Sequence, residues 1–141
     1  MTRRGSPPGC LRCANVALRP RESPAGISFF ACPSCGREYA EKEGGALTFR
    51  WGHPVSLALY GVQFAPDPLA RMQRVAQDLM ARVPADRLAA MMGEIELELA
   101  QPTQQVRDIL GCVAPEASCR EFLAALTSTV SQALGRAQTT R

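Results

Sequence analysis

Six cysteines are the residues of this sequence best suited to chemistry, and four of them form two close pairs. Two residues separate Cys10 from Cys13, two separate Cys32 from Cys35, and 18 residues lie between the pairs. A Cys-x2-Cys pair can turn both sulfurs toward one point, and two such pairs complete the tetrahedron of soft ligands that Zn²⁺ prefers. This spacing is typical of zinc sites in intracellular chains. We therefore predict that Cys10, Cys13, Cys32 and Cys35 bind one Zn²⁺.

The second pair is followed directly by Gly36. Glycine can adopt positive φ, which lets a tight turn point backbone N–H groups at a cysteine sulfur. With this motif, residues 8–51 resemble the zinc-ribbon and rubredoxin-like proteins, in which two such turns at the ends of short antiparallel strands hold one metal. The resemblance implies the same four ligands, although Ala14 and Asn15 follow Cys13 where many ribbons have glycine. Iron is the alternative metal, and the 18-residue spacer with few aromatic residues favours zinc.

Disulfides or plain buried thiols are the alternative for the four paired cysteines. Cys-x2-Cys disulfides occur mainly in redox enzymes, where the motif begins a helix after a strand, and neither pair has that setting. A catalytic zinc needs an open coordination position, which four cysteines do not leave. Glu94, Glu96 and Glu98 are close in sequence, but residues two apart on a helix point in different directions. Without a nucleophile–base pair or a phosphate loop, we expect the protein not to be an enzyme.

The remaining reactive side chains are predicted to have structural roles. His53, the only histidine, would be surplus as a fifth ligand and has no nucleophile beside it, so we interpret it as a linker residue. Cys112 and Cys119 are separated by six residues and a predicted helix start. We expect them to be buried free thiols rather than a further metal pair.

Charge is distributed unevenly along the chain. The net charge is +3 overall, +4 for residues 1–50 and −1 for residues 51–141. Four thiolates on one Zn²⁺ would leave the site at −2, so the first half has only a weak positive field for nucleic acid. Nucleic-acid binding is nevertheless the alternative function, as the resemblance to transcription-associated zinc ribbons implies. Its contacts would come from Arg12, Arg19, Arg21 and Arg37.

Short strands are predicted around the cysteines because apolar, β-branched and aromatic residues recur there in short runs. The expected strands are 14–18, 27–31, 37–40 and 46–51. Residues 19–26, with two prolines and a glycine, are predicted to be a loop, and Gly44–Gly45 a turn. The aromatic side chains of this region are expected to pack in the core rather than to bind nucleic acid: Phe29, Phe30, Tyr39 and Trp51.

Helical periodicity follows the ribbon, after residues 55–64, which are ambiguous between a helix and a strand. Helices are expected from Pro68 to Pro84, from about Asp86 to Pro102, from Thr103 to Gly111 and from Ser118 to Gly135. The predicted caps are Asp67, Thr103 and the capping-box pair of Ser118 and Glu121. The two or three residues around Pro84 predict a helical hairpin. The glutamates of the second helix are expected mostly outside its apolar stripe.

These patterns predict an α+β protein, in which an N-terminal zinc ribbon of small antiparallel β-structure precedes a C-terminal bundle of about four α-helices. The expected parts are a disordered tail 1–9, a zinc ribbon 10–51, a linker 52–66, a helical domain 67–135 and a frayed tail 136–141. The lack of an 18-residue apolar run or a signal peptide predicts a soluble, cytoplasmic protein without a membrane partner. We expect a non-enzymatic adaptor whose helical domain binds another protein or a second copy of the chain.

Overall fold

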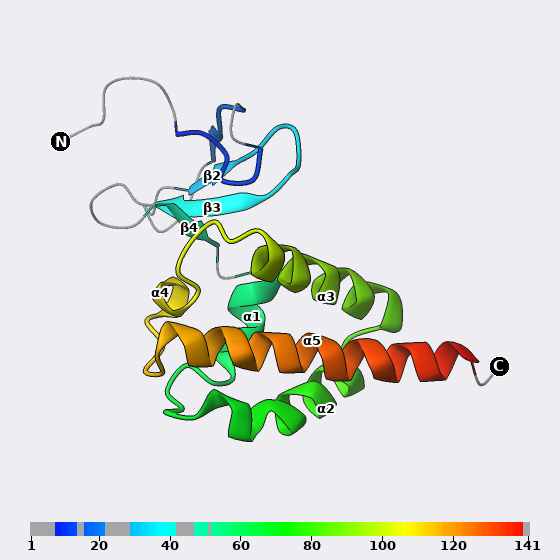
Figure 1. Ribbon diagram of the computed structural model, residues 1–141. Helices are drawn as coiled ribbons and strands as arrows, with labels where there is room; N and C mark the ends of the chain where they lie inside the picture. The colour runs from blue at the N-terminus through cyan, green and yellow to red at the C-terminus, as the bar shows by residue number, and fades with distance from the viewer. Residues whose placement is uncertain (1–7, 14–15, 22–28, 42–46, 51, 140–141) are drawn as a thin grey trace. The chain divides into compact units, whose positions relative to one another are not determined.

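The computed structural model describes residues 8–13, 16–21, 29–41, 47–50 and 52–139. The chain divides into two compact units, Met1–His53 and Pro54–Arg141, which can be followed by colour in Figure 1. The first unit contains an antiparallel β-sheet and the second consists of packed helices, so the predicted α+β class is confirmed. No helix within the described ranges is both long enough and apolar enough to cross a membrane.

The sheet of the first unit has the strand order β1-β2-β3-β4, with each strand antiparallel to its neighbour. The strands are β1 Arg19–Arg21, β2 Phe29–Ala31, β3 Glu38–Glu41 and β4 Leu47–Phe49. The register aligns Pro20, Phe30, Tyr39 and Phe49 across the sheet. Directly opposite residues share a face, and Tyr39 and Phe49 are almost fully buried there. The predicted core packing is confirmed for Phe29 and Tyr39, Phe30 is only half-buried, and Trp51 lies outside the described residues.

The loop predicted at residues 19–26 is wrong in its first part, because residues 19–21 form β1. Among the described strands, β1 lies at the edge of the sheet and pairs with β2 alone. Proline is tolerated in an edge strand, since its missing N–H need not break a ladder hydrogen bond. Residues 22–26 and the predicted turn at Gly44–Gly45 lie outside the described part of the chain.

The strand predicted at residues 14–18 is not part of the sheet. Of its described residues, Ala17 forms an isolated bridge with Gly9, and the Leu18 N–H donates to the Pro8 carbonyl at 2.9 Å. Pro8 and Gly9, which the sequence assigns to the tail, therefore pair with the chain that follows the first cysteine pair.

The helical unit is built around α5, Glu116–Thr139. The other helices are α1 Pro54–Tyr60, the 3₁₀ helix η2 Pro68–Arg71, α2 Met72–Arg82, α3 Ala85–Ala100 and α4 Arg107–Leu110. In Figure 1, α5 passes between α2 and α3, and it packs against both. α2 and α3 follow one another as predicted, but they do not pack along each other as a closed hairpin would, because α5 lies between them. Fully buried side chains from several helices form the core: Val55, Leu59, Leu88, Met92, Ile95, Phe122, Leu123, Leu126 and Val130.

The predicted start of α4 is wrong because carboxylates from other helices bind its backbone. Glu98, expected outside the apolar stripe of α3, is only 1% exposed. Its carboxylate accepts hydrogen bonds from the Thr103 N–H at 2.7 Å and the Thr103 hydroxyl at 2.8 Å. Thr103 thus anchors the loop after α3 instead of capping a helix. The Glu116 carboxylate accepts the N–H groups of Val106 and Arg107, at 3.0 and 2.8 Å, and takes over the capping role.

Three other predicted helix ends also differ from the structure. Asp67 precedes η2 without a side-chain capping hydrogen bond. The last helix begins at Glu116, so Ser118 and Glu121 lie inside it and form no capping box. The helix also continues through Gly135, where it was predicted to end. A glycine inside a helix costs only about 1 kcal/mol, which tertiary packing can offset.

Candidate metal centre

Two backbone turns bring the cysteine pairs together, and we call residues 10–13 the first knuckle and residues 32–35 the second knuckle. The Cys10 N–H donates to the Val16 carbonyl at 2.9 Å and closes the first knuckle. In the second knuckle, the Cys32 N–H donates to the Arg37 carbonyl and the Gly36 N–H donates to the Cys32 carbonyl, both at 2.9 Å. Gly36 has φ of +77°, the left-handed conformation expected for a glycine that closes such a turn.

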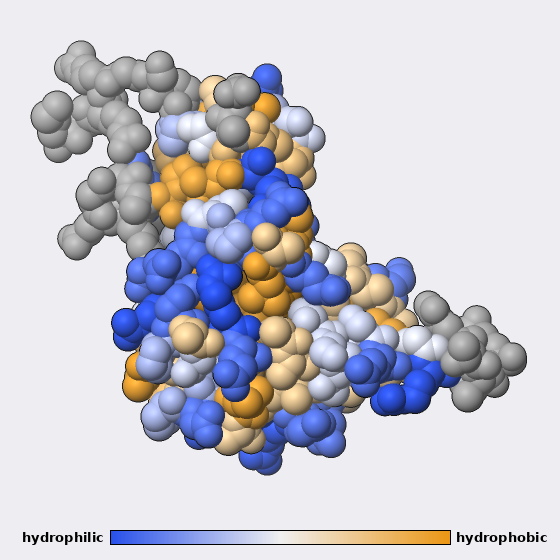
Figure 2. All heavy atoms as spheres, in the orientation of Figure 1, coloured by the Kyte–Doolittle hydropathy of each residue, from blue (hydrophilic) through white to orange (hydrophobic). Residues whose placement is uncertain are grey.

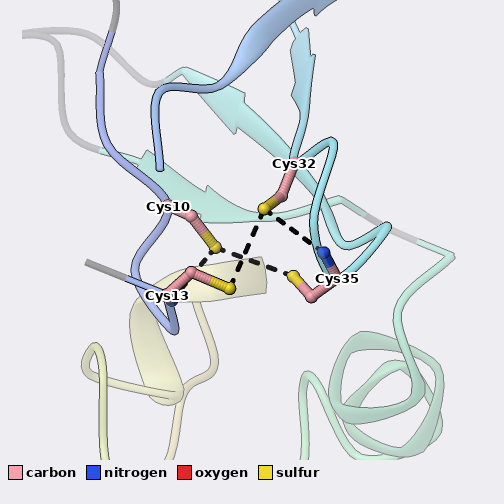
Figure 3. A group of neighbouring side chains, drawn as sticks. All are labelled: Cys10, Cys13, Cys32 and Cys35. Carbon is pink, nitrogen blue, oxygen red and sulfur yellow. Dashed lines mark hydrogen bonds between the residues drawn. The ribbon is translucent and has the colours of Figure 1, made fainter. Parts of the chain in front are cut away.

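The four sulfurs converge on one point, as Figure 3 shows. All four Sγ atoms lie within 4.8 Å of one another. Two of the sulfur–sulfur contacts join one knuckle to the other, 3.8 Å from Cys10 to Cys35 and 3.9 Å from Cys13 to Cys32. Four sulfurs in a tetrahedron about 2.3 Å from Zn²⁺ are about 3.8 Å apart. A disulfide needs about 2.05 Å, and all four cysteines are free, so the predicted alternative of two disulfides does not apply here.

Both knuckles form the same backbone hydrogen bond to the sulfur of their first cysteine. The backbone N–H of Cys13 points at the Cys10 sulfur, and that of Cys35 points at the Cys32 sulfur, both at 3.4 Å. The first cysteine of each pair is buried, whereas the second is half-buried. N–H groups aimed at a sulfur stabilise its negative charge, so each knuckle prepares a buried thiolate for a cation.

A tyrosine from the sheet supports the first of these sulfurs. The Tyr39 hydroxyl lies 3.4 Å from the Cys10 sulfur, and the Tyr39 ring is stacked on Phe49 with 5.7 Å between ring centroids. Phe49 in turn stacks on His53 at 3.6 Å. His53, interpreted from the sequence as a linker residue, therefore ends an aromatic stack that leads to the metal centre. The sequence indicated only that Tyr39 would be buried, and its position opposite Phe30 and Phe49 in the strand register is the signal for its contact.

Burial and the hydrogen bonds around the sulfurs change the pKa values of the thiols. Burial alone would raise the pKa of Cys10, but hydrogen bonds from the Tyr39 hydroxyl and from the N–H groups of Cys13 and Arg12 lower it from 9.0 to about 6. The pKa of Cys13 is instead raised to about 12, first by its hydrogen bond to Cys35 and then by burial. One thiolate therefore forms readily, and like charge opposes the next ones. A bound cation would offset that repulsion, since cysteines bind metals as thiolates.

The four arginines proposed for nucleic-acid binding occupy two kinds of position. Arg19 and Arg21 are exposed and, being two residues apart on β1, lie on the same face of the strand. Arg12 lies in the first knuckle and Arg37 directly follows the second, where both are half-buried and take part in other interactions. The structure thus brings Arg19 and Arg21 together on the sheet and leaves Arg12 and Arg37 beside the metal centre.

A further arginine, not identified from the sequence, lies on the face of the sheet opposite Tyr39. The Arg50 guanidinium is 3.9 Å from the centre of the Phe29 ring and forms an ion pair with Glu38 at 2.8 Å. Arg21 pairs with Phe29 in the strand register, so its side chain shares this face. The exposed groups of this face are therefore basic, while the Phe29 ring is buried beneath the Arg50 guanidinium.

The two remaining cysteines lie in the helical unit and are buried free thiols, as predicted. Burial raises the pKa of Cys112, and it raises that of Cys119 to about 12. Both therefore stay neutral at physiological pH. A metal ion would need at least three His, Cys, Asp or Glu side chains close together. Among the described residues, the four knuckle cysteines form the one such group.

Comparisons of the chain with protein-family models, with curated proteins and with solved structures found no match.

Proposed function

We propose that the first unit is a zinc ribbon in which Cys10, Cys13, Cys32 and Cys35 hold one structural Zn²⁺. The observation that carries this proposal is the spacing of the sulfurs, because the contacts of 3.8 and 3.9 Å between the knuckles match a tetrahedral shell. A tetrahedral set of four thiolates is typical of zinc or of iron bound to sulfur. Zinc is the metal we propose, and iron is the alternative for the same ligands.

The bound ion would contribute folding free energy rather than reactivity. Four protein sulfurs leave no coordination position for water or substrate, which a catalytic zinc requires. The buried Cys10 and Cys32 and the Tyr39 hydroxyl favour a permanent site, since they lie at the contact between the knuckles and the sheet. The proposed role is therefore non-enzymatic.

The helical unit is the part we propose to bind a partner, either another protein or a second copy of the chain. The support is the exposure of large apolar side chains at the end of α1, where Tyr60 is 74% and Phe64 is 77% exposed. Soluble proteins that expose neighbouring aromatic side chains often use them in interfaces. The chain would then be an adaptor that combines a metal-stabilised ribbon with a partner-binding helical unit.

Elemental analysis together with native mass spectrometry tests both parts of the proposal. We expect one zinc per chain, and either a mass above that of the monomer or a partner that is cross-linked to the protein in cell extract. Cys10→Ser/Cys32→Ser should abolish zinc binding, whereas the control Cys112→Ser/Cys119→Ser should keep one zinc per chain. A folded protein without metal would contradict the zinc ribbon, and a monomer without any partner would contradict the adaptor role.

Nucleic-acid binding by the ribbon is the second candidate function. It is favoured by the exposed Arg19 and Arg21, which share a face of the sheet with Arg50. Basic side chains gathered on one face attract the phosphates of a nucleic acid. Fluorescence anisotropy at low salt should then detect binding to DNA or RNA that weakens steeply as salt is added. Equal, negligible signals from single and double strands would rule this candidate out.

A further inference from the structure

The end of α1 exposes two aromatic rings on one side while the other side is buried. Tyr60 and Phe64 are four residues apart and among the most exposed large apolar residues of the described chain. Leu59 and Val62, which alternate with them, are buried. This division places both aromatic residues on the outer side of the chain as α1 gives way to a turn. Figure 2 shows apolar residues in orange that reach the surface of the helical unit among polar residues in blue.

A groove lies next to the chain segment that carries Tyr60 and Phe64. Gly61, between them in sequence, lines it together with Ala70, Arg71, Arg74 and Val75, and its volume is about 670 Å³. A Cβ atom at Gly61 would lie 3.5 Å from Val75 Cγ2, so a larger side chain at this position would enter the groove. A volume of several hundred Å³ is in the range of pockets that bind ligands or side chains.

The charge at the groove is positive and locally unbalanced. Arg71 and Arg74 are exposed, and neither guanidinium forms an ion pair or hydrogen bond with any residue of the described chain. Asp78 is the acidic residue of the lining, one turn after Arg74, and it forms no ion pair with that arginine. Two unpaired guanidinium groups in the groove, with two exposed rings on the chain segment that borders it, complement a ligand with carboxylates and a large apolar side chain.

We propose that this surface, defined by Tyr60, Gly61, Phe64, Arg71 and Arg74, binds an acidic peptide segment of a partner protein. Large apolar side chains of the segment pack on the two rings and enter the groove, and its carboxylates pair with the two arginines. The inference rests on the proposed partner-binding role of the helical unit and is independent of the zinc site.

Charge favours this occupant over a nucleic acid or a second copy of the chain. The groove offers two exposed arginines and one acid, Asp78, which suits a short segment with a few carboxylates and large apolar side chains better than the continuous charge of a nucleic acid. Self-association through this surface would place like guanidinium groups against each other in a two-fold dimer.

The proposal is tested by selecting displayed random 16-residue peptides on the full-length, zinc-loaded protein, with counter-selection on Tyr60→Ser/Phe64→Ser. We expect the selected peptides to be rich in Asp, Glu and large apolar residues. In fluorescence anisotropy, Arg71→Glu/Arg74→Glu should weaken a selected synthetic peptide at least tenfold. The control Arg82→Glu/Arg87→Glu, which reverses two exposed arginines outside the groove, should change its affinity less than twofold. A peptide with lysine in place of its acidic residues should regain affinity for Arg71→Glu/Arg74→Glu.

Several results would overturn the proposal. One is the selection of no peptide, or of peptides that bind the groove variant as tightly as the native protein. Another is binding of a single-stranded oligothymidylate that Arg71→Glu/Arg74→Glu abolishes, since it would assign the surface to nucleic acid. A dimer that Tyr60→Ser/Phe64→Ser dissociates would assign it to self-association. One zinc per chain in the same variants would show that such a failure concerns the helical surface and leaves the ribbon proposal standing.

Discussion

Removal of the metal should unfold the ribbon and leave the helical unit intact. Besides cysteines, four apolar side chains of the described ribbon are at least nine-tenths buried: Leu18, Phe29, Tyr39 and Phe49. Their burial contributes about 6–12 kcal/mol at most. Structural Zn²⁺ contributes an apparent 10–16 kcal/mol, so its loss removes about half or more of the favourable free energy. A small domain is stable by only about 5–15 kcal/mol in total, and this loss should therefore unfold it.

Hydrogen exchange measured by mass spectrometry, before and after addition of a strong zinc chelator, can follow the two units separately. Peptides that cover residues 29–41 should lose their protection, whereas peptides from α3 and α5 should keep it, because those helices have their own core. The variant Cys112→Ala/Cys119→Ala serves as a control and should show the same chelator response. Protection of residues 29–41 that survives complete loss of metal would refute the reasoning.

Three further predictions concern single side chains. Tyr39→Phe removes the hydroxyl 3.4 Å from the Cys10 sulfur, so zinc affinity should fall about 10- to 100-fold in a chelator competition titration, and an unchanged affinity would exclude this role. Glu98→Ala leaves the N–H and hydroxyl of Thr103 without their acceptor, and should lower the free energy of unfolding in urea by about 2–5 kcal/mol; a loss below about 1 kcal/mol contradicts it. Burial raises the pKa of Cys119 from 9.0 to about 12, so above pH 9 the unfolded chain loses a proton that the folded chain keeps. Stability should be unaffected below pH 9 and fall by up to about 1.4 kcal/mol per pH unit above it, and Cys119→Ala should flatten this decline in urea titrations. Identical slopes would show that Cys119 does not contribute.

The candidate metal site is the feature that sequence predicts best, because its information is local. The spacing within each cysteine pair determines the turn, and Gly36 supplies the positive φ that the second turn needs. The role of Tyr39 is not local, since 29 positions separate it from the sulfur that it contacts. Only the register of β2, β3 and β4 places its hydroxyl at the first knuckle, and that register is not encoded in any single segment.

The helices illustrate the same difference between local and distant information. Apolar periodicity predicts where α2, α3 and α5 lie, because each needs one buried stripe. Their ends depend on hydrogen-bond partners, and a capping motif such as Ser118–Glu121 only offers one possible partner. Glu116 and Glu98 instead supply carboxylates to the chain between α3 and α5 from both of its sides.

This arrangement explains why a buried carboxylate at position 98 is compatible with a stable core. The loop after α3 has backbone N–H groups that no helix or sheet satisfies, and an unpaired buried N–H group costs about 1–3 kcal/mol. Glu98 satisfies one of them and the Thr103 hydroxyl as well. A sequence pattern treats a glutamate in an amphipathic helix as solvent-exposed. Glu98 is buried instead, because the backbone N–H groups of the loop need hydrogen-bond acceptors within the folded unit.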